Sequence, residues 1–374
     1  MRYEPPPAGL CLTLLLLSGS VAPLFAGFPV PAIEFSPREY PCHYTSQAPV
    51  IDGRLESPLW DQAPWSEDFV EIRSNELAPA PRQRTRARLL WDEEFLFVAA
   101  ELEESDLWGT LEQRDAVIYH DNDFELFLDP DGDAHSYYEL EINALGTVWD
   151  LLLLWPYRDG NSAVNAWDIA GLQSAVSLNG TLNDPSDTDT GWSVELALPW
   201  SVLAERGNRQ VPPTEGDVWR LNFSRVQWHL DVVDGQYRKR LDHEGNPLPE
   251  DNWVWSAQGL VAMHYPERWG YLHFLEAPEA RLKPVADSPG ERAVAWLWEL
   301  YYRQMEARES QGRWITDPER LLGGLERPAG FQWPPELSLG ERRWQVVLQP
   351  VGGDGELSID ETGRLQRPPL REEE

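Results

Sequence analysis

The chain has 374 residues, and its 63 Asp and Glu residues against 31 Lys and Arg residues give a formal net charge of −32. So large a negative charge argues against binding of nucleic-acid phosphates or anionic lipid, because both require basic patches. The 19 tryptophans are unusually many, and their flat amphipathic rings suit core packing as well as stacking on a ligand with one apolar face.

Residues 1–26 are typical of a signal peptide. Arg2 precedes the apolar run LCLTLLLL, and the small residues after it place cleavage near Ala26. The run is too short to span a bilayer, and no other segment is long and apolar enough for a transmembrane helix. We therefore expect a secreted or periplasmic protein, whose mature chain keeps Cys42 as its single cysteine and has no intramolecular disulfide.

The segments from residue 45 to residue 278 predict a mainly β fold, an antiparallel β-sandwich. Residues 27–44, before them, form a proline-rich leader. Short alternating segments separated by Gly, Pro and Asp are typical of sandwich strands. RARLLWDEEFLFVAAEL predicts a hairpin, and DFELFLD and YYELEIN predict two strands joined by the turn sequence DPDGD. GWSVELALPWSVL, GDVWRLNFSRVQW and WGYLHF supply further strands.

Residues 285–368 predict a small α+β extension at the C-terminal end of the sandwich. In ERAVAWLWELYYRQMEARESQGRW the apolar residues recur at helical spacing, which predicts an amphipathic helix. RRWQVVLQPVGGDGELSIDETGRLQ then predicts two short strands around a Gly-rich turn. The sequence does not define an oligomeric state.

The central strand pair carries acidic and amide side chains opposite its apolar stripe. Asp123 and Glu125 alternate with apolar residues in one strand, and Glu139, Glu141 and Asn143 do so in the next. One interpretation is a solvated face, which antiparallel sheets commonly have. The other is a site for a polar ligand, because carboxylates accept hydrogen bonds from hydroxyl pairs and an amide both donates and accepts.

Four sequence motifs, in this order, resemble family 9 carbohydrate-binding modules and their DOMON-like relatives. They are VIDGRLESPLWDQAPW, RARLLWDEEFLFVAAELEESD, DNDFELFLDPDGDAHSYYELEINALG, and GWSVELALPWSVL followed by GDVWRLNFSRV and ERWGYLHF. The resemblance covers residues 45–275 and implies a jelly-roll or DOMON-like sandwich. It also implies an exported, non-catalytic protein that binds an oligosaccharide or polysaccharide and serves carbohydrate catabolism, of the kind associated with glycosyl hydrolases acting on xylan or cellulose.

The resemblance also implies site residues. Family 9 modules hold a sugar between two aromatic side chains, and Tyr119 stands where the family has its first aromatic wall. Glu125 matches the strand carboxylate that binds hydroxyls, and Asn143 matches a binding asparagine. Glu141 falls where some members have a binding arginine.

The second aromatic wall has no clean counterpart in this sequence. The segment DNWVWSAQGLVAMHYPERWG lies in the corresponding place and offers Trp253, Trp255 or Tyr265 for stacking. Arg225, in NFSRV, lies on a strand expected beside the site. Its guanidinium group can bridge two hydroxyls or form a structural ion pair, and both interpretations stay open.

The turn DPDGD places Asp129, Asp131 and Asp133 close together. Oxygen ligands around a glycine are typical of a calcium loop, although the bidentate glutamate of an EF-hand is missing. The alternative is a polar hairpin turn. Family 9 modules hold structural calcium, so the resemblance keeps a bound ion in view, and no other cofactor is expected.

Three other classes of function have partial support in the sequence. Glycoside hydrolysis needs two carboxyl groups flanking a cleft, but so acidic a chain supplies such pairs by chance, and no catalytic residue is predicted. DOMON relatives that bind haem through Met and His suggest an electron-transfer protein. Met263 and His264 are adjacent and would point to opposite faces of a strand, which leaves Met263 with His229. A glycoside hydrolase accessory or scaffold protein without its own sugar site is the third.

Overall fold

The computed structural model describes residues 27–75, 78–206, 209–353 and 355–372. The expected signal peptide lies outside these residues. A 13-stranded sheet dominates the described chain, with the strand order β8-β7-β6-β5-β11-β15-β1-β3-β4-β10-β9, and β14 and β2 pair beside β11. Its strands are β1 (Glu39–Tyr44), β2 (Val70–Glu71), β3 (Thr85–Trp91), β4 (Phe95–Glu103), β5 (Asp123–Asp129), β6 (Tyr137–Asn143), β7 (Val148–Leu153), β8 (Ala163–Val164), β9 (Gln173–Asn179), β10 (Gly191–Pro199), β11 (Val218–Gln227), β14 (Asp251–Val254) and β15 (Gly270–Leu275).

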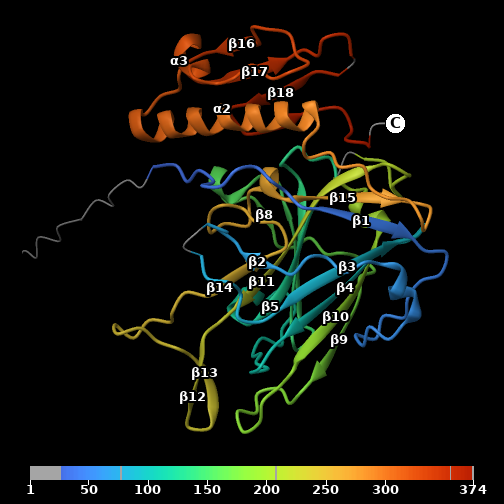
Figure 1. Cartoon of the computed structure of the whole chain (residues 1–374). Helices are drawn as coiled ribbons and strands as arrows, with labels where there is room; N and C mark the ends of the chain where they lie inside the picture. The colour runs from blue at the N-terminus through green and yellow to red at the C-terminus, as the bar shows by residue number, and fades with distance from the viewer. Residues whose placement is uncertain (1–26, 76–77, 207–208, 354, 373–374) are drawn as a thin grey trace, which may run out of the picture.

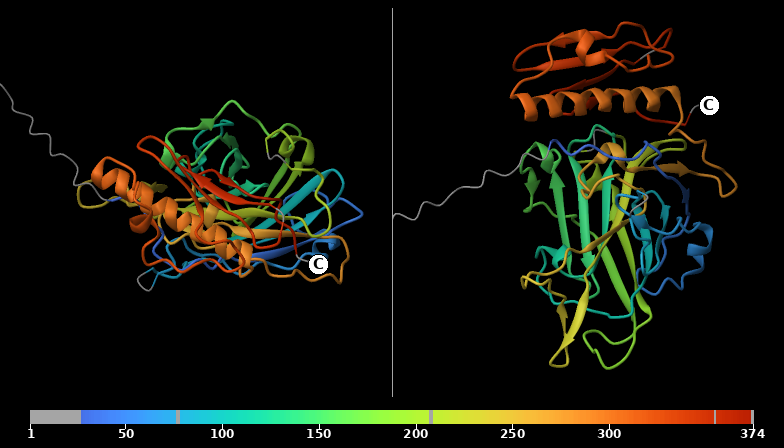
Figure 2. Two further views of the ribbon diagram at one scale, coloured as in Figure 1. Left: turned by 90° about the horizontal axis from the view of Figure 1, so that it is seen from above. Right: turned by 60° about the vertical axis from the view of Figure 1, so that its left-hand side comes forward.

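The sheet curls into two layers that enclose one large apolar core (Figures 1 and 2). Phe124, Leu126 and Leu140 from one layer share this core with Val98 and Leu196 from the other. The expected mainly β sandwich is therefore confirmed. Its pairing is antiparallel except around β1, which runs parallel to both β15 and β3 and joins the two layers.

The register of β5 and β6 separates an apolar face from an acidic one. Phe124 lies opposite Ile142, and Glu125 lies opposite Glu141. Because successive side chains of a strand point to opposite faces, the phenylalanine and isoleucine enter the core and the two glutamates point away from it. A curled sheet thus presents a carboxyl ladder on the side opposite its core.

Short helical turns and one hairpin complete the sandwich. The turns are η1 (Pro58–Gln62), η2 (Ile118–His120), α1 (Trp200–Leu203), η3 (Tyr157–Asp159) and η4 (Pro266–Arg268). The hairpin, β12 (Leu230–Val233) with β13 (Gln236–Lys239), projects from the end remote from the C-terminal helix (Figure 1). None of the described helices is long and apolar enough to cross a membrane.

The C-terminal part consists of α2 (Pro289–Gln311), α3 (Pro318–Leu322) and a four-stranded sheet of β16 (Glu336–Leu339), β17 (Trp344–Leu348), β18 (Leu357–Asp360) and β19 (Leu365–Gln366). We call it the C-terminal unit. Ser288 caps α2 by accepting a hydrogen bond from the Glu291 N–H, and Gly312 ends it in a left-handed conformation. Helix α2 lies between this small sheet and the end of the sandwich (Figure 1).

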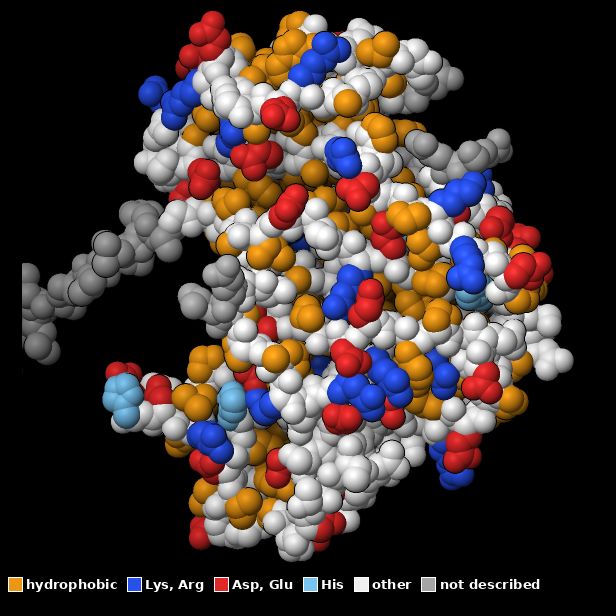
Figure 3. All heavy atoms as spheres, in the orientation of Figure 1, with side chains coloured by type: hydrophobic (Ala, Val, Ile, Leu, Met, Phe, Trp, Pro, Cys, Tyr) orange, Lys and Arg blue, Asp and Glu red, His pale blue; other side chains and the backbone are white. Residues whose placement is uncertain are grey.

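Apolar contacts and buried ion pairs hold the C-terminal unit against the sandwich. Phe28 and Tyr265 join the apolar cluster of α2 and its sheet, and hydrophobic side chains run from one part to the other on the face drawn in Figure 3. Glu291 of α2 forms ion pairs with Arg220 of β11 at 3.2 Å and with Arg367. The unit is therefore packed onto the sandwich as part of one folded body.

Candidate functional site

The face of β5 and β6 that points away from the core forms the floor of a groove of about 470 Å³. Strands β5, β6 and β7 supply the floor, and η2, η3 and the segments around residues 250 and 264 supply its rim. The residues that line the groove include Tyr119, Glu125, Phe127, Glu139, Glu141, Trp149, Tyr157, Asn161, Asn165, Val226, Glu250, Asn252, Met263 and His264.

Buried carboxyl groups dominate the floor. Oxygen atoms of Asp123, Glu125 and Glu141 lie within 4.8 Å of one another. Glu141 Oε2 accepts a hydrogen bond from the Tyr119 N–H at 2.8 Å, which ties the floor to η2. Asp123 Oδ1 accepts one from the Val226 N–H at 3.0 Å.

The environment of these groups favours their protonated forms. Burial raises the pKa of Glu125 to about 7. Burial, together with repulsion from the neighbouring carboxylates, also raises the pKa of Glu139 and Glu141 well above the usual range. Desolvation penalises the charged form, and like charges nearby add to that penalty. A protonated carboxyl donates one hydrogen bond and still accepts others, so the floor can exchange both kinds with a ligand.

Aromatic rings stand beside the carboxyl ladder. The ring centroids of Tyr119 and Trp149 are 6.4 Å apart with an interplanar angle of 34°. Trp149 lies opposite Glu141 in the β6–β7 register, so its ring is on the groove side of the sheet. Tyr157 of η3 packs edge-on against His264, and the centroids of the two rings are 4.3 Å apart. Tyr119 and Tyr157 are both 39% exposed and offer their rings to a ligand.

His264 belongs to the groove as a neutral side chain. Its Nδ1 atom lies 2.8 Å from the Tyr137 hydroxyl, and burial lowers its pKa to about 3. Met263 also lines the groove. His229 does not, and it lies 3.5 Å from Asp251 instead, so the Met263–His229 pair considered for haem is not brought together.

Asn143 has a structural role in place of the binding role expected from the resemblance. It is fully buried. Its amide nitrogen donates to Leu111 O at 2.9 Å and to Asp121 Oδ2 at 3.0 Å. Its amide oxygen accepts from the N–H groups of Leu145 and Thr147 at 3.1 and 3.0 Å. All four hydrogen bonds of the amide are thus used, two within the β6–β7 turn and two to the segment that precedes β5.

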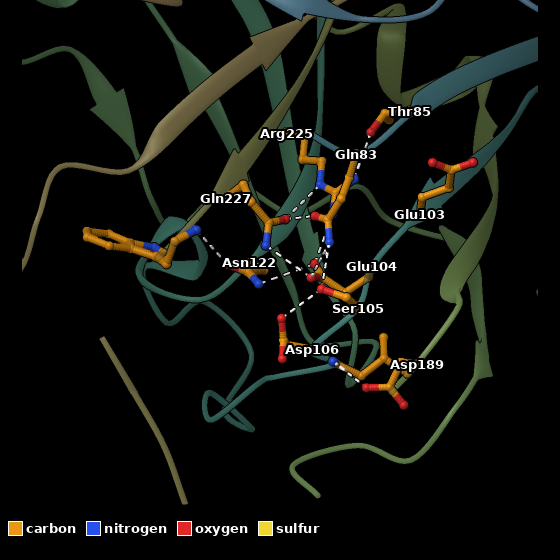
Figure 4. A network of polar contacts seen from close by, with 12 residues as sticks. Gln83, Thr85, Glu103, Glu104, Ser105, Asp106, Asn122, Asp189, Arg225 and Gln227 are labelled. Carbon is orange, nitrogen blue, oxygen red and sulfur yellow. Dashed lines mark hydrogen bonds and ion pairs between the residues drawn. The ribbon is translucent and has the colours of Figure 1, made fainter. Parts of the chain in front are cut away.

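Arg225 points away from the groove. Ser224 is the residue that lies opposite Glu125 in the β11–β5 register, so the next side chain along β11 points to the core side of the sheet. There Arg225 Nη2 lies 2.8 Å from Glu104 Oε2, and Nη1 donates to Thr85 Oγ1 at 2.9 Å (Figure 4). Of the two interpretations of Arg225, the structural ion pair is the one present.

The tryptophans chosen for the second aromatic wall are buried. Trp253 is 2% exposed and lies opposite Arg225 in the β11–β14 register, on the core side of the sheet. Trp255 is fully buried against Tyr40 and Phe223. Tyr265 is 2% exposed. None of these rings offers a face to a ligand, and the expectation of stacking at Trp253 or Trp255 is wrong in this structure.

The groove contains residues that sequence reasoning missed, chiefly Trp149 and Tyr157, with Glu250. A signal for Trp149 exists in the sequence. A tight turn after Asn143 returns the chain along β6, and the alternation of VWDLLL then places Trp149 beside Glu141. Tyr157 has no such signal, because it lies in a single helical turn placed by tertiary contacts.

The turn between β5 and β6 keeps both of its interpretations. Oxygen atoms of Asp129, Asp131 and Asp133 lie within 4.8 Å of one another, a spacing that suits a cation. However, Asp129 already accepts hydrogen bonds from the N–H groups of Gly132 and Ala134, both at 3.0 Å. Asp133 Oδ2 is paired with Arg364 Nε of the C-terminal unit at 2.8 Å. The calcium ion stays a prediction.

Comparisons with known proteins agree with the resemblance. Residues 51–218 match the family model described as carbohydrate family 9 binding domain-like, a region that holds the floor carboxyls, Tyr119, Trp149 and Tyr157. Exoglucanase XynX of Acetivibrio thermocellus is 26% identical over 155 residues, and endo-1,4-beta-xylanase A of Thermoanaerobacterium saccharolyticum is 25% identical over 156 residues. Each alignment covers 41% of this chain but only 12% and 11% of those enzymes.

Two solved structures are also similar. One is a family 9 carbohydrate-binding module from Caldicellulosiruptor kristjanssonii in complex with cellotriose, with 15% identity, a TM-score of 0.41, and coverage of 66% of this chain and 99% of that one. The other is a putative carbohydrate-binding protein from Bacteroides uniformis, with 16% identity, a TM-score of 0.47, and coverage of 64% and 100%.

Proposed function

We propose that the protein binds carbohydrate in the groove and does so without catalysis, as an exported component of a polysaccharide-degrading system. The observation that carries the proposal is the Tyr119–Trp149 ring pair beside the Glu125–Glu141 ladder, inside the region that matches the family model. The names of the two related enzymes, an exoglucanase and a xylanase, support the polysaccharide setting.

The groove has the chemistry that a sugar requires. The C–H face of a sugar ring is apolar and stacks on an aromatic face, while its hydroxyl groups need polar partners. The rings of Tyr119, Trp149 and Tyr157 supply the first requirement, and Glu125 and Glu141 supply the second. The cavity, at about 470 Å³, falls within the usual range of small-molecule sites, roughly 300–1,000 Å³.

The carboxyl groups are arranged for binding and not for glycoside hydrolysis. A glycosidase places its two carboxyl groups on either side of the scissile bond. Glu125 and Glu141 instead stand side by side on one floor, directly opposite each other in adjacent strands. A sugar above them would meet both groups from the same side, where they can hold hydroxyls but cannot act as an acid and a nucleophile across a bond.

Calorimetric titration with a panel of soluble oligosaccharides tests the proposal. A hydrogen bond to a charged group contributes roughly 1.5–3 kcal/mol, so Glu125→Ala should weaken binding about tenfold to a hundredfold. Tyr119→Ala should weaken it by a comparable factor through lost stacking. Glu112→Ala, an exposed glutamate that does not line the groove, is the matched control. Absence of binding across the panel, or a Glu125→Ala variant that keeps its affinity but melts far lower, would contradict the proposal.

A further inference from the structure

The groove has an unusual balance of charge for a sugar site. Four glutamates line it, namely Glu125, Glu139, Glu141 and Glu250, and no Lys or Arg side chain is among the described residues that line it. His264 contributes no positive charge, because burial lowers its pKa to about 3. Arg158, a neighbouring cation on η3, is committed to Glu267 at 2.7 Å.

The floor also has acceptors that nothing in the described chain satisfies. Asp123 Oδ2 and Glu139 Oε2 are buried and have no hydrogen-bond partner among the described residues. Asp123 is fully buried and Glu139 is 4% exposed. A buried carboxylate is stable only with a hydrogen-bond donor or a compensating charge. Of the two residues, Glu139 lines the groove and Asp123 does not, so it is Glu139 that presents an acceptor which a donor-rich ligand would satisfy.

Aromatic rings complete a set of groups that suits a cation. The faces of tyrosine and tryptophan rings attract a cation through their electron-rich π systems, and Tyr119, Trp149 and Tyr157 lie around the carboxyl groups. A neutral hydroxyl can hydrogen-bond to these groups, but it gains no ionic attraction from a carboxylate. An ammonium group has three donors and no acceptor, and it also pairs by charge with the carboxylates that line the groove.

Resting on the proposed function, we propose that the groove selects sugars that carry a free amino group, such as oligomers of β-1,4-linked glucosamine, over neutral glucan or xylan oligomers. The sugar ring stacks on Tyr119 and Trp149, and its ammonium group donates to Glu139 and Glu141. Binding of the cation ionises these carboxyls, whose pKa values burial raises in the empty groove, so complex formation releases protons.

The test is calorimetric titration of the full chain with three trimers, those of glucosamine, N-acetylglucosamine and glucose, at about pH 6, where an amine is protonated. Each titration is run with and without EDTA, and in two buffers of different ionisation enthalpy. We expect the glucosamine trimer to bind at least about tenfold more tightly than either of the others, through charge-assisted hydrogen bonds. We also expect proton release with that ligand alone, and no effect of EDTA.

Glu139→Gln separates charge from shape. This variant should lower the ratio of glucosamine-trimer affinity to glucose-trimer affinity, whereas Glu112→Gln should leave that ratio as in the wild type. A glucose trimer that binds as tightly as the glucosamine trimer overturns the inference and leaves the proposed function standing. Neutral-sugar binding that EDTA abolishes also overturns it, because the carboxyls then hold a divalent cation. Failure of all three trimers contradicts the proposed function itself. Should Glu139→Gln not fold, the comparison of trimers on the wild-type chain still decides.

Discussion

Replacing Arg225 with alanine should destabilise the sandwich and leave carbohydrate affinity unchanged. The guanidinium group is fully buried and lies 2.8 Å from Glu104 Oε2. It also donates to Thr85 Oγ1 at 2.9 Å and to Gln227 Oε1 at 2.6 Å. Removing it leaves the Glu104 carboxylate, 3% exposed, without its counter-charge. Breaking a buried ion pair in this way costs about 3–5 kcal/mol, a large share of a typical stability of about 5–15 kcal/mol.

Urea denaturation of the wild type and the variant measures this loss, and titration with the ligand found for the wild type measures affinity. A double variant, Arg225→Met with Glu104→Leu, removes both charges and should recover part of the lost stability, since apolar residues can replace a buried pair at little cost. The reasoning is refuted if Arg225→Ala lies within about 0.5 kcal/mol of the wild type, the range of ordinary surface substitutions. It is equally refuted if affinity falls as far as in Glu125→Ala.

Three further outcomes are expected. Trp149→Ala should weaken carbohydrate binding by about 0.5–1.5 kcal/mol or more through lost ring contact, while Trp155→Ala, an exposed tryptophan outside the groove lining, should not; titration of both decides. Arg158→Met should cost about 3–5 kcal/mol by denaturation, because its partner carboxylate stays buried, and should also weaken binding by freeing Tyr157. His273 is buried, but its hydrogen bonds to two glutamates raise its pKa above the ordinary value. The stability that its charged form contributes is therefore complete below about pH 6.5 and is lost as pH rises through the raised pKa. His273→Gln should flatten the fall in melting temperature over that range of pH.

Local sequence pattern predicted the sandwich and the faces of its central strands, because apolar and polar residues alternate there with a period of two. Glu125 and Glu141 were placed on the groove side for that reason. In strand β11 this alternation reverses, since Arg225 and Gln227 stand in the phase that Leu221 and Phe223 hold earlier in the strand. The side to which Arg225 points therefore depends on register with β5, which only the folded sheet defines. The same ambiguity misplaced Trp253, which follows the face of its neighbour across the β11–β14 ladder.

For the site residues that the family resemblance implies, tertiary contacts decide whether the side chain reaches the groove. Tyr119 and Glu125 line the groove because the strand and the turn before it bring them there. Asn143 keeps the expected position in sequence, yet a neighbouring aspartate and three backbone groups occupy its amide. The sequence of a single strand does not show which distant groups will hydrogen-bond to its side chains.

The turn η3 contacts both the groove and helix α2 of the C-terminal unit. Tyr157 enters the groove, while the next two residues are held from the other side, Arg158 by Glu267 at 2.7 Å and Asp159 by the Tyr301 hydroxyl of α2 at 2.8 Å. A substitution in α2 that shifts Asp159 is therefore expected to shift a ring of the groove as well. If the groove binds the proposed ligand, a mutational screen confined to the groove lining would overlook such positions in the C-terminal unit.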